Sequence, residues 1–88
     1  MKNNLRVHRA IYNISQDELA KAVGSHRQTI FAIESGKYLP NSLLAMKIAY
    51  VLNKSVEEIF RLDDSEIEGL VRFKAESDFF ALHKTGFD

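Results

Sequence analysis

Three neighbouring side chains near the middle of the chain, Arg27, Gln28 and Phe31, carry groups that match the edges of DNA bases. An arginine guanidinium can fork onto O6 and N7 of guanine, a glutamine amide can bridge N6 and N7 of adenine, and a phenylalanine ring can contact the methyl group of thymine. With Ala32, these residues are one or four apart, so they lie side by side on a helix. The pattern predicts a helical face that reads the major groove. A merely solvated polar face is the competing interpretation.

The rest of the sequence gives little support for catalysis or metal binding. The absence of cysteine excludes disulfides, thiolate metal sites and cysteine nucleophiles. The three histidines lie far apart without a second ligand at metal spacing, and we expect His8 on a helix surface and His83 in the tail. The sequence has no glycine-rich phosphate loop and no nucleophile elbow. We therefore expect no enzyme, no cofactor and no metal site.

Charge is divided unevenly along the chain, although 12 Lys and Arg balance 12 Asp and Glu. Residues 1–54 hold eight basic and three acidic residues, a net charge of +5, so the remainder carries −5. Such segregation favours a polyanion as the partner of the first part. A dipolar surface without a binding role is the alternative.

Two short helices are predicted before the reading face. Residues 3–12 form the first, where apolar residues recur at helical spacing, namely Val7, Ala10, Ile11 and Ile14. The second begins after Ser15, which forms a capping box with Glu18. The apolar edge of this helix consists of Leu19, Ala22 and Val23. Gly24 ends it, because a helix C-terminus favours a residue in the left-handed conformation.

The helix that carries the reading face follows almost at once. It starts within residues 25–27 and ends at Ser35 and Gly36, with Ile30 and Ile33 directed inward. Two helices of about eight and nine residues around a short turn have the geometry of a DNA-binding helix-turn-helix, whose second helix enters the major groove. Ala20 is small where the two helices would cross. Residues 16–35 therefore predict this motif, with the recognition helix at 27–35.

The remaining sequence completes an all-α bundle and continues beyond it. Residues 36–41 contain the only proline and predict a loop. A fourth helix is expected at 42–53 from the spacing of Leu44, Ile48, Val51 and Leu52. Ser55 and Glu58 form a second capping box, and the inward residues after it are Val56, Ile59 and Phe60. No stretch alternates long enough to predict a strand, and a sixth helix is expected at 65–80.

Several stretches agree in one register with a known family: residues 13–20 (NISQDELA), 27–30 (RQTI), 33–37 (IESGK), Pro40, 45–49 (AMKIA) and 55–60 (SVEEIF). In these, residues 4–60 resemble the phage-repressor class of helix-turn-helix regulators, the Cro-type or xenobiotic-response-element family. The resemblance implies a compact five-helix DNA-binding domain, which we place at residues 1–62. The sequence pattern changes after Arg61, so we expect a C-terminal extension, helical in part, over 63–88. The resemblance further implies a homodimeric regulator of transcription, a repressor, that binds double-stranded DNA at an inverted-repeat operator.

The resemblance also gives roles to individual side chains. It implies that Gln16 holds a phosphate at the start of the second helix. The residues of the third helix that face the bases would be Arg27, Gln28, Thr29, Phe31 and Ala32. The next stretch of DNA backbone would be held by Ser35, Lys37 and Tyr38. Phosphate contacts set the register, whereas base contacts set the sequence that is read.

Arg9 and Glu34 are expected to form an ion pair between the first and third helices. The resemblance implies this pair, and the position of Glu34 beside the inward Ile33 supports it, because a lone carboxylate there would be costly. We expect a partly buried pair that fixes the recognition helix. An exposed pair of almost no energetic value is the alternative.

One position departs from the pattern of the family, which usually has an apolar residue after the turn glycine and then a serine cap. Here these residues are Ser25 and His26. Either His26 takes the cap position, or Ser25 caps the helix with Gln28 as its box partner, which would tie Gln28 to its own backbone. At this position His26 could touch a phosphate, so we include it among the DNA-contacting residues.

The extension 63–88 holds more aromatic residues than a solvated tail needs, namely Phe73, Phe79, Phe80 and Phe87. It could be an added helix on the bundle, a dimerisation element, or a segment within 65–88 that binds a partner protein. The last interpretation leads to a second functional hypothesis, a protein-interaction module such as an antitoxin that also binds its own operator. No apolar stretch approaches the ~20 residues that span a bilayer, so we expect a cytoplasmic protein without a membrane segment.

Overall fold

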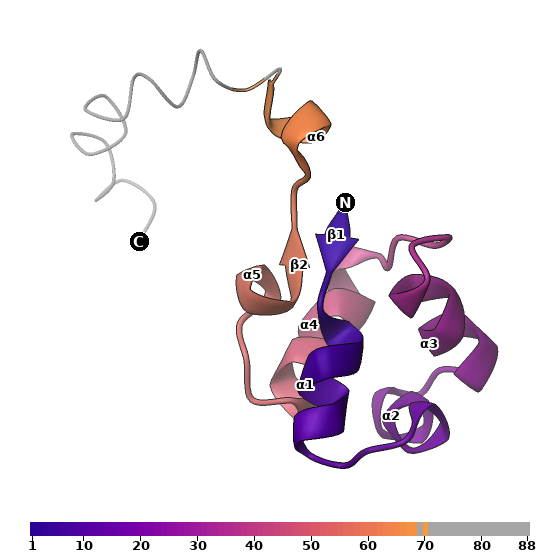
Figure 1. Ribbon diagram of the computed structural model, residues 1–88. Coiled ribbons are helices and arrows are strands. Elements are labelled where there is room, and N and C mark those ends of the chain that lie inside the picture. Colours follow the sequence, from indigo (N-terminus) through magenta and orange to yellow (C-terminus); the bar gives the residue numbers. More distant parts are fainter. Residues whose placement is uncertain (69, 71–88) are drawn as a thin grey trace.

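The computed structural model describes residues 1–68 and residue 70. Six helices and two short strands follow one another along this part of the chain. The elements are β1 (Lys2–Asn3), α1 (Leu5–Ile11), α2 (Gln16–Val23), α3 (Arg27–Glu34), α4 (Ser42–Val51), α5 (Val56–Ile59), β2 (Phe60–Arg61) and α6 (Asp64–Glu68). Figure 1 shows α1 to α5 gathered into one bundle, with α6 beyond the end of the bundle that holds the N-terminus. The predicted helical bundle is confirmed, with a small two-stranded ribbon added to it.

Side-chain hydrogen bonds begin two of the helices where the sequence predicts them. The hydroxyl of Ser15 accepts from the amide of Glu18 at 3.0 Å, and the Glu18 carboxylate accepts from the amide of Ser15 at 2.9 Å. Ser55 and Glu58 repeat this exchange at 3.2 Å and 2.7 Å. The hydrogen bond from the Ser15 amide lowers the pKa of the Glu18 carboxyl, and the Ser55 amide does the same to Glu58. Both predicted capping boxes are confirmed.

Four helices end in the same way, at a residue in the left-handed conformation. These residues are Asn13, Gly24, Gly36 and Asn53. After α2, the amide of Ser25 donates to the carbonyl of Ala20 at 2.8 Å, and the amide of Gly24 donates to that of Lys21 at 3.3 Å. This pair of bonds defines a Schellman motif, and it recurs after α1, α3 and α4. The stop predicted at Gly24 is confirmed.

The hydrophobic core joins all five helices of the bundle. Its largest fully buried side chains are Leu5, Leu19, Ile30, Ile33, Ile48, Leu52 and Ile59. Phe60 is 7% exposed and closes the core from the β2 side. The inward residues predicted for α3, α4 and α5 therefore lie in the core or pack against it.

The face that α1 turns inward differs from the prediction. Leu5 is fully buried, whereas Val7 is 58% and Ile11 64% exposed, and Ala10 is exposed as well. Val7 follows Leu5 by two residues, which is about 200° around a helix, so it points away from the core when Leu5 points into it. The apolar residues whose spacing predicted this helix, Val7, Ala10 and Ile11, are therefore not on its buried side. Ile14, after the helix, does pack against the core.

A two-stranded antiparallel ribbon joins the beginning of the bundle to its end. Lys2 pairs with Arg61 and Asn3 with Phe60. The sequence prediction of a first helix from residue 3 and of no strand is wrong here, because two-residue strands are too short to show an alternating pattern. The side chain of Asn3 extends the ribbon to the recognition helix by donating from Nδ2 to the carbonyl of Ile33 at 2.9 Å.

The last described helix, α6, begins near the predicted sixth helix. Asp63 caps it by accepting from the Ser65 hydroxyl at 2.7 Å and from the Glu66 amide at 3.0 Å. These hydrogen bonds hold the pKa of the Asp63 carboxyl far below its usual range. The remainder of the predicted helix 65–80, the four tail phenylalanines and His83 lie outside the described residues. Among the residues that are described, no helix has the length and apolarity to cross a membrane.

Candidate nucleic-acid interface

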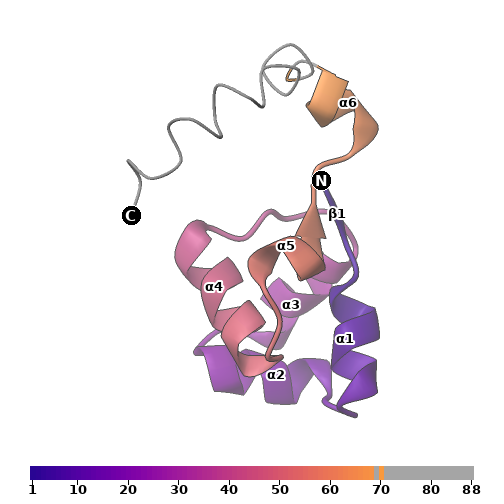
Figure 2. The same cartoon turned by 90° about the vertical axis from the view of Figure 1, so that its left-hand side faces the viewer.

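The two helices of the predicted motif pack across a turn formed by Gly24, Ser25 and His26. The residues that these two helices contribute to the core are Leu19, Ala20, Val23, Ile30 and Ile33. Ala20 is 1% exposed, which fits a small residue at a close crossing. Of the predicted apolar edge, Leu19 and Val23 are buried, whereas Ala22 is exposed because it lies about 200° around the helix from the buried Ala20. Figure 2 shows that α3 lies on the far side of the bundle from α5.

The start of the recognition helix resolves the open question about its cap. His26 has extended backbone angles, φ −116° and ψ 151°, and is the residue before the first helical residue, Arg27. The carbonyl of His26 accepts from the amides of Thr29 and Ile30 at 3.0 Å and 3.2 Å, whereas its side chain makes no capping hydrogen bond. His26 therefore takes the cap position, and no box with Ser25 occupies Gln28.

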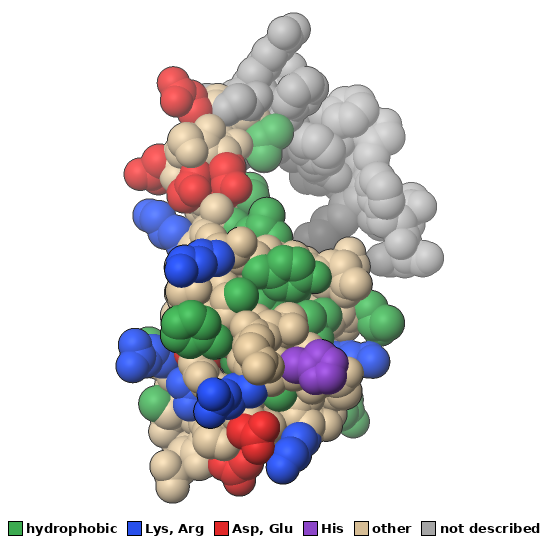
Figure 3. Space-filling model, turned by 90° about the vertical axis from the view of Figure 1, so that its right-hand side faces the viewer, with side chains coloured by type: hydrophobic (Ala, Val, Ile, Leu, Met, Phe, Trp, Pro, Cys, Tyr) green, Lys and Arg blue, Asp and Glu red, His purple; other side chains and the backbone are tan. Residues whose placement is uncertain are grey.

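The outer face of α3 presents polar groups around an aromatic ring. Arg27 and Gln28 are exposed, and Phe31 is 55% exposed. Thr29 and Ala32 are half-buried beside them. Within residues 1–68, no hydrogen bond engages the side chain of Arg27 or Gln28. Figure 3 looks onto the side of the molecule that carries this helix, where Lys and Arg side chains lie among hydrophobic ones.

A partly buried network holds the end of α3 against α1 and α2. Arg9 Nε lies 2.8 Å from Glu34 Oε2, and Arg9 Nη2 donates to Glu34 Oε1 at 3.2 Å. Arg9 Nη1 donates to the carbonyl of Ile14 at 2.8 Å. The side chains of Arg9 and Glu34 are 16% and 6% exposed, and their hydrogen bonds raise the pKa of Arg9. The expected pair is therefore present, and it is nearly buried rather than exposed.

Gln16 belongs to the same network. Its Nε2 donates to Glu34 Oε1 at 3.1 Å, so one of the two amide protons is already in use. The second proton is available to a ligand, and the side chain is half-buried at the first position of α2. The network fixes where this second donor points, which matters for the phosphate-binding role that the family resemblance implies.

The segment after α3 places three of the predicted residues at one end of that helix. Lys37 and Tyr38 donate their amides to the carbonyl of Ala32 at 2.9 Å and 3.2 Å, and their side chains are exposed. The hydroxyl of Ser35 donates to the same carbonyl at 3.1 Å. Since its proton is engaged, Ser35 offers a ligand mainly its acceptor lone pairs.

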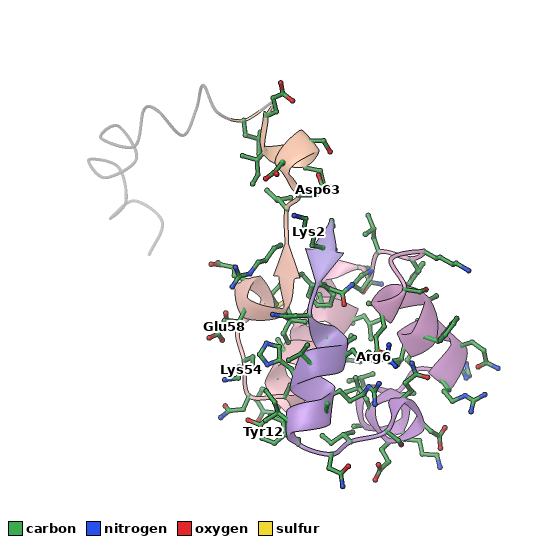
Figure 4. The ribbon with its side chains drawn as sticks, viewed as in Figure 1. Lys2, Arg6, Tyr12, Lys54, Glu58 and Asp63 are labelled. Atoms are coloured by element: carbon green, nitrogen blue, oxygen red, sulfur yellow. The ribbon has the colours of Figure 1, made fainter. Side chains whose placement is uncertain are left out.

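One further basic residue, Arg6, was not predicted from the sequence and lies on α1 beside α3. A cleft of about 140 Å³ is lined by Arg6, Gln16, Phe31, Glu34 and Ser35. In Figure 4, Arg6 lies on the side of α1 that faces α3, whereas Lys54 lies on the opposite side of the bundle. The available signal was the spacing of Arg6 and Arg9, which places both on one side of a helix.

Each acidic side chain within residues 1–54 has a partner. Asp17 lies 3.2 Å from Lys21, Glu18 is engaged in its capping box, and Glu34 is paired with Arg9. The basic groups around α3 are therefore not balanced by nearby carboxylates. Within the described part of the chain, no three His, Asp or Glu side chains could hold a metal ion.

A surface helix with base-complementary side chains, supported by a helix-turn-helix and flanked by unbalanced positive charge, defines a DNA-binding domain. The sequence model of the helix-turn-helix family matches residues 5–59. The chain belongs to this family, in its XRE-type branch, and is a transcriptional regulator with a helix-turn-helix DNA-binding domain. The family is non-enzymatic.

The chain is similar to several HTH-type transcriptional regulators. It is 50% identical over 66 residues to an uncharacterized one from Methanocaldococcus jannaschii, covering 75% of this chain and 100% of that one. It is 48% identical over 69 residues to one from Archaeoglobus fulgidus, covering 78% and 99%. YgzD of Bacillus subtilis is 42% identical over 64 residues, covering 73% and 97%.

The fold also matches a solved structure. The crystal structure of the clp gene regulator ClgR from Corynebacterium glutamicum superposes with a TM-score of 0.60 over 92% of this chain and 84% of that chain. The two sequences are 24% identical in this match, so the likeness concerns the fold alone.

Proposed function

We propose that this regulator binds an inverted-repeat operator in double-stranded DNA as a homodimer and represses transcription there. The observation that carries the proposal is the outer face of α3, where Arg27, Gln28 and Phe31 face solvent without partners among the described residues. An aromatic ring that is 55% exposed between two base-complementary side chains favours a surface that becomes covered on binding. In this proposal α3 enters the major groove, and the protein acts in the cytoplasm.

The proposed contacts divide into base readers and backbone holders. Arg27, Gln28 and Phe31 read bases, with Thr29 and Ala32 against the groove wall. The residues that hold the backbone are Gln16, His26, Ser35, Lys37 and Tyr38. The Arg9–Glu34 pair touches no DNA in this proposal but fixes α3 in the position from which it reads.

Dimerisation is supported by apolar side chains on α4. Leu43, Met46 and Tyr50 lie three or four residues apart and are 62%, 62% and 87% exposed, so they share one side of that helix. Covering such a surface favours association. We propose that residues 1–62 bind DNA and that the extension 63–88 contributes to the dimer, which would present two recognition helices ~34 Å apart.

The same α4 surface favours one other candidate function, a protein-interaction module such as an antitoxin that also binds its own operator. In that case Leu43, Met46 and Tyr50, with part of 65–88, would contact a different protein. The two candidates differ in what the purified chain does alone: the first predicts a dimer with tight operator binding, and the second predicts weak DNA binding without its partner.

Selection of bound sites from a random duplex pool at about 150 mM salt tests the proposal. We expect enrichment of an inverted repeat with half-sites ~10 bp apart. Light scattering on the purified chain should give twice the mass of one chain. A monomer that enriches no sequence at this salt and binds only weakly at low salt would contradict the proposal and favour the protein-interaction module.

A further inference from the structure

The cleft beside the recognition helix brings together side chains from three helices. Arg6 comes from α1 and Gln16 from α2, while Phe31 and Glu34 come from α3 and Ser35 follows it. The cleft has a volume of about 140 Å³ and is partly open to solvent. A phosphate group needs no more room than this.

The charges in the cleft do not cancel. Glu34 is fully engaged, because it accepts two hydrogen bonds from Arg9 and one from Gln16, and its side chain is only 6% exposed. The positive charge of Arg9 therefore balances the negative charge of Glu34. Arg6 is exposed, and within residues 1–68 no hydrogen bond or ion pair involves its guanidinium. One uncompensated positive charge remains at the mouth of the cleft.

The donors in the cleft fit an oxyanion. Arg6 has a planar fork of N–H groups, and the second amide proton of Gln16 is held in place by the bond from Gln16 to Glu34. A guanidinium fork matches the spacing of two phosphate oxygens. Phe31 lines the same cleft and stands on the face proposed to enter the major groove. When α3 lies in the major groove, the anions nearest to this cleft are the backbone phosphates along the edge of the groove.

We propose that Arg6 and Gln16 together hold one backbone phosphate in this cleft. The proposal rests on the proposed function and extends the DNA-binding surface to α1, outside the helix-turn-helix. A contact on α1 limits how deeply and at what angle α3 enters the groove, since α1 and α3 are joined by the Arg9–Glu34 pair. Such a contact acts equally on all sequences.

The variant Arg6→Gln in the full chain tests the proposal by fluorescence anisotropy over a range of salt, on the selected operator and on an unrelated duplex. We expect about 10-fold weaker binding to both DNAs at about 150 mM salt, the effect of one charge-assisted hydrogen bond. The slope of log K against log salt should fall in magnitude by ~0.9. Arg6→Lys should restore the slope but only part of the affinity, because it keeps the charge and loses the fork.

Lys54→Gln is the matched control, since it removes the same charge from the side of the bundle away from α3. We expect a change of less than about 2-fold and an unchanged slope, because that charge is separated from the DNA by more than a screening length of ~8 Å. Equal losses in the two variants would overturn the proposal.

The failure of this proposal is distinguishable from failure of the proposed function. An unchanged slope and affinity in Arg6→Gln, with wild-type protein that still prefers its operator, would overturn the Arg6 contact alone. Wild-type protein without sequence preference or salt dependence would overturn both. The urea midpoint of Arg6→Gln should equal that of the wild type, because Arg6 makes no polar contact in the described structure.

Discussion

Replacing Arg9 by alanine would leave the Glu34 carboxylate with the Gln16 amide as its remaining partner among the described residues. The side chain of Glu34 is 6% exposed, so water could not replace the lost guanidinium without movement of α3. The substitution also removes the hydrogen bond from Arg9 to the Ile14 carbonyl. We expect the fold to be destabilised strongly and the recognition helix to be held less firmly.

The size of this loss follows from burial. Removing one partner from a buried pair costs ~3–5 kcal/mol, and the hydrogen bond that Gln16 keeps puts Arg9→Ala at the lower end, about 3 kcal/mol. Two charge-assisted hydrogen bonds at ~1.5 kcal/mol each give the same value. For a domain of this size ~1 kcal/mol lowers Tm by ~4–8 °C, so the loss in Tm should exceed about 10 °C.

Urea unfolding followed by circular dichroism measures the free energy of unfolding, with a constant m value as the condition for comparison. The double variant Arg9→Met with Glu34→Met leaves no unpaired charge and should recover at least ~1.5 kcal/mol of what the single variant loses. Asp17→Asn is the matched control, because it breaks a pair whose side chains are 56% and 78% exposed and should cost less than about 0.5 kcal/mol.

A loss of less than about 0.5 kcal/mol in Arg9→Ala would refute this reasoning, because it would equate a nearly buried pair with an exposed one. Strict additivity in the double variant would refute it as well. Operator affinity, measured at a temperature at which Arg9→Ala remains folded, should fall at least several-fold. Unchanged affinity would show that the pair stabilises the fold without positioning α3.

Three further predictions concern the helix ends and the reading face. Gly24→Ala should cost about 1 kcal/mol in urea unfolding, because φ is +70° there while the added Cβ would meet no atom within 4 Å. The pKa values of Glu18 and Glu58 are lowered in the folded protein, so these carboxylates stabilise the fold above the unfolded pKa of ~4.3, and this stability is lost as pH falls through their folded pKa values. The free energy of unfolding of the double variant Glu18→Gln, Glu58→Gln should therefore depend less on pH between about 3 and 5. Gln28→Ala should change the base preferred at one position in repeated site selection while leaving the salt slope unchanged; a uniform loss on all sequences would contradict its reading role.

The features that the sequence predicted correctly are encoded locally. The capping boxes at Ser15 and Ser55 and the left-handed stop at Gly24 each depend on residues within one or two turns, so their types alone indicate the conformation. The inward residues of α3 follow from spacing on a helix whose two ends are marked in this way. The outer face of α3 follows by exclusion once Ile30 and Ile33 are placed inward.

The features that the sequence did not predict depend on contacts between distant segments. Which side of α1 is buried depends on where the helix begins, and the pairing of Asn3 with Phe60 decides that. Val7 and Ile11 have the apolar character of core residues, so composition favoured the wrong side. Arg6 joins the candidate site because α1 packs beside α3. Its spacing from Arg9 places both residues on one side of α1 but does not by itself indicate which helix that side faces.

The ribbon between β1 and β2 has a consequence for the order in which a newly made chain can become compact. Domains begin to fold from the N-terminus during synthesis. Each of the helices α1 to α4 is followed within two residues by the left-handed residue that ends it, so these end signals leave the ribosome directly after each helix. The partner of β1 is among the last parts of the bundle to be made, since the Asn4 amide binds the Ile59 carbonyl at 3.0 Å and Lys2 pairs with Arg61. A nascent chain arrested before residue 59 therefore lacks the residues that close the core, and resistance to protease should appear in one step as residues 59–61 leave the ribosome.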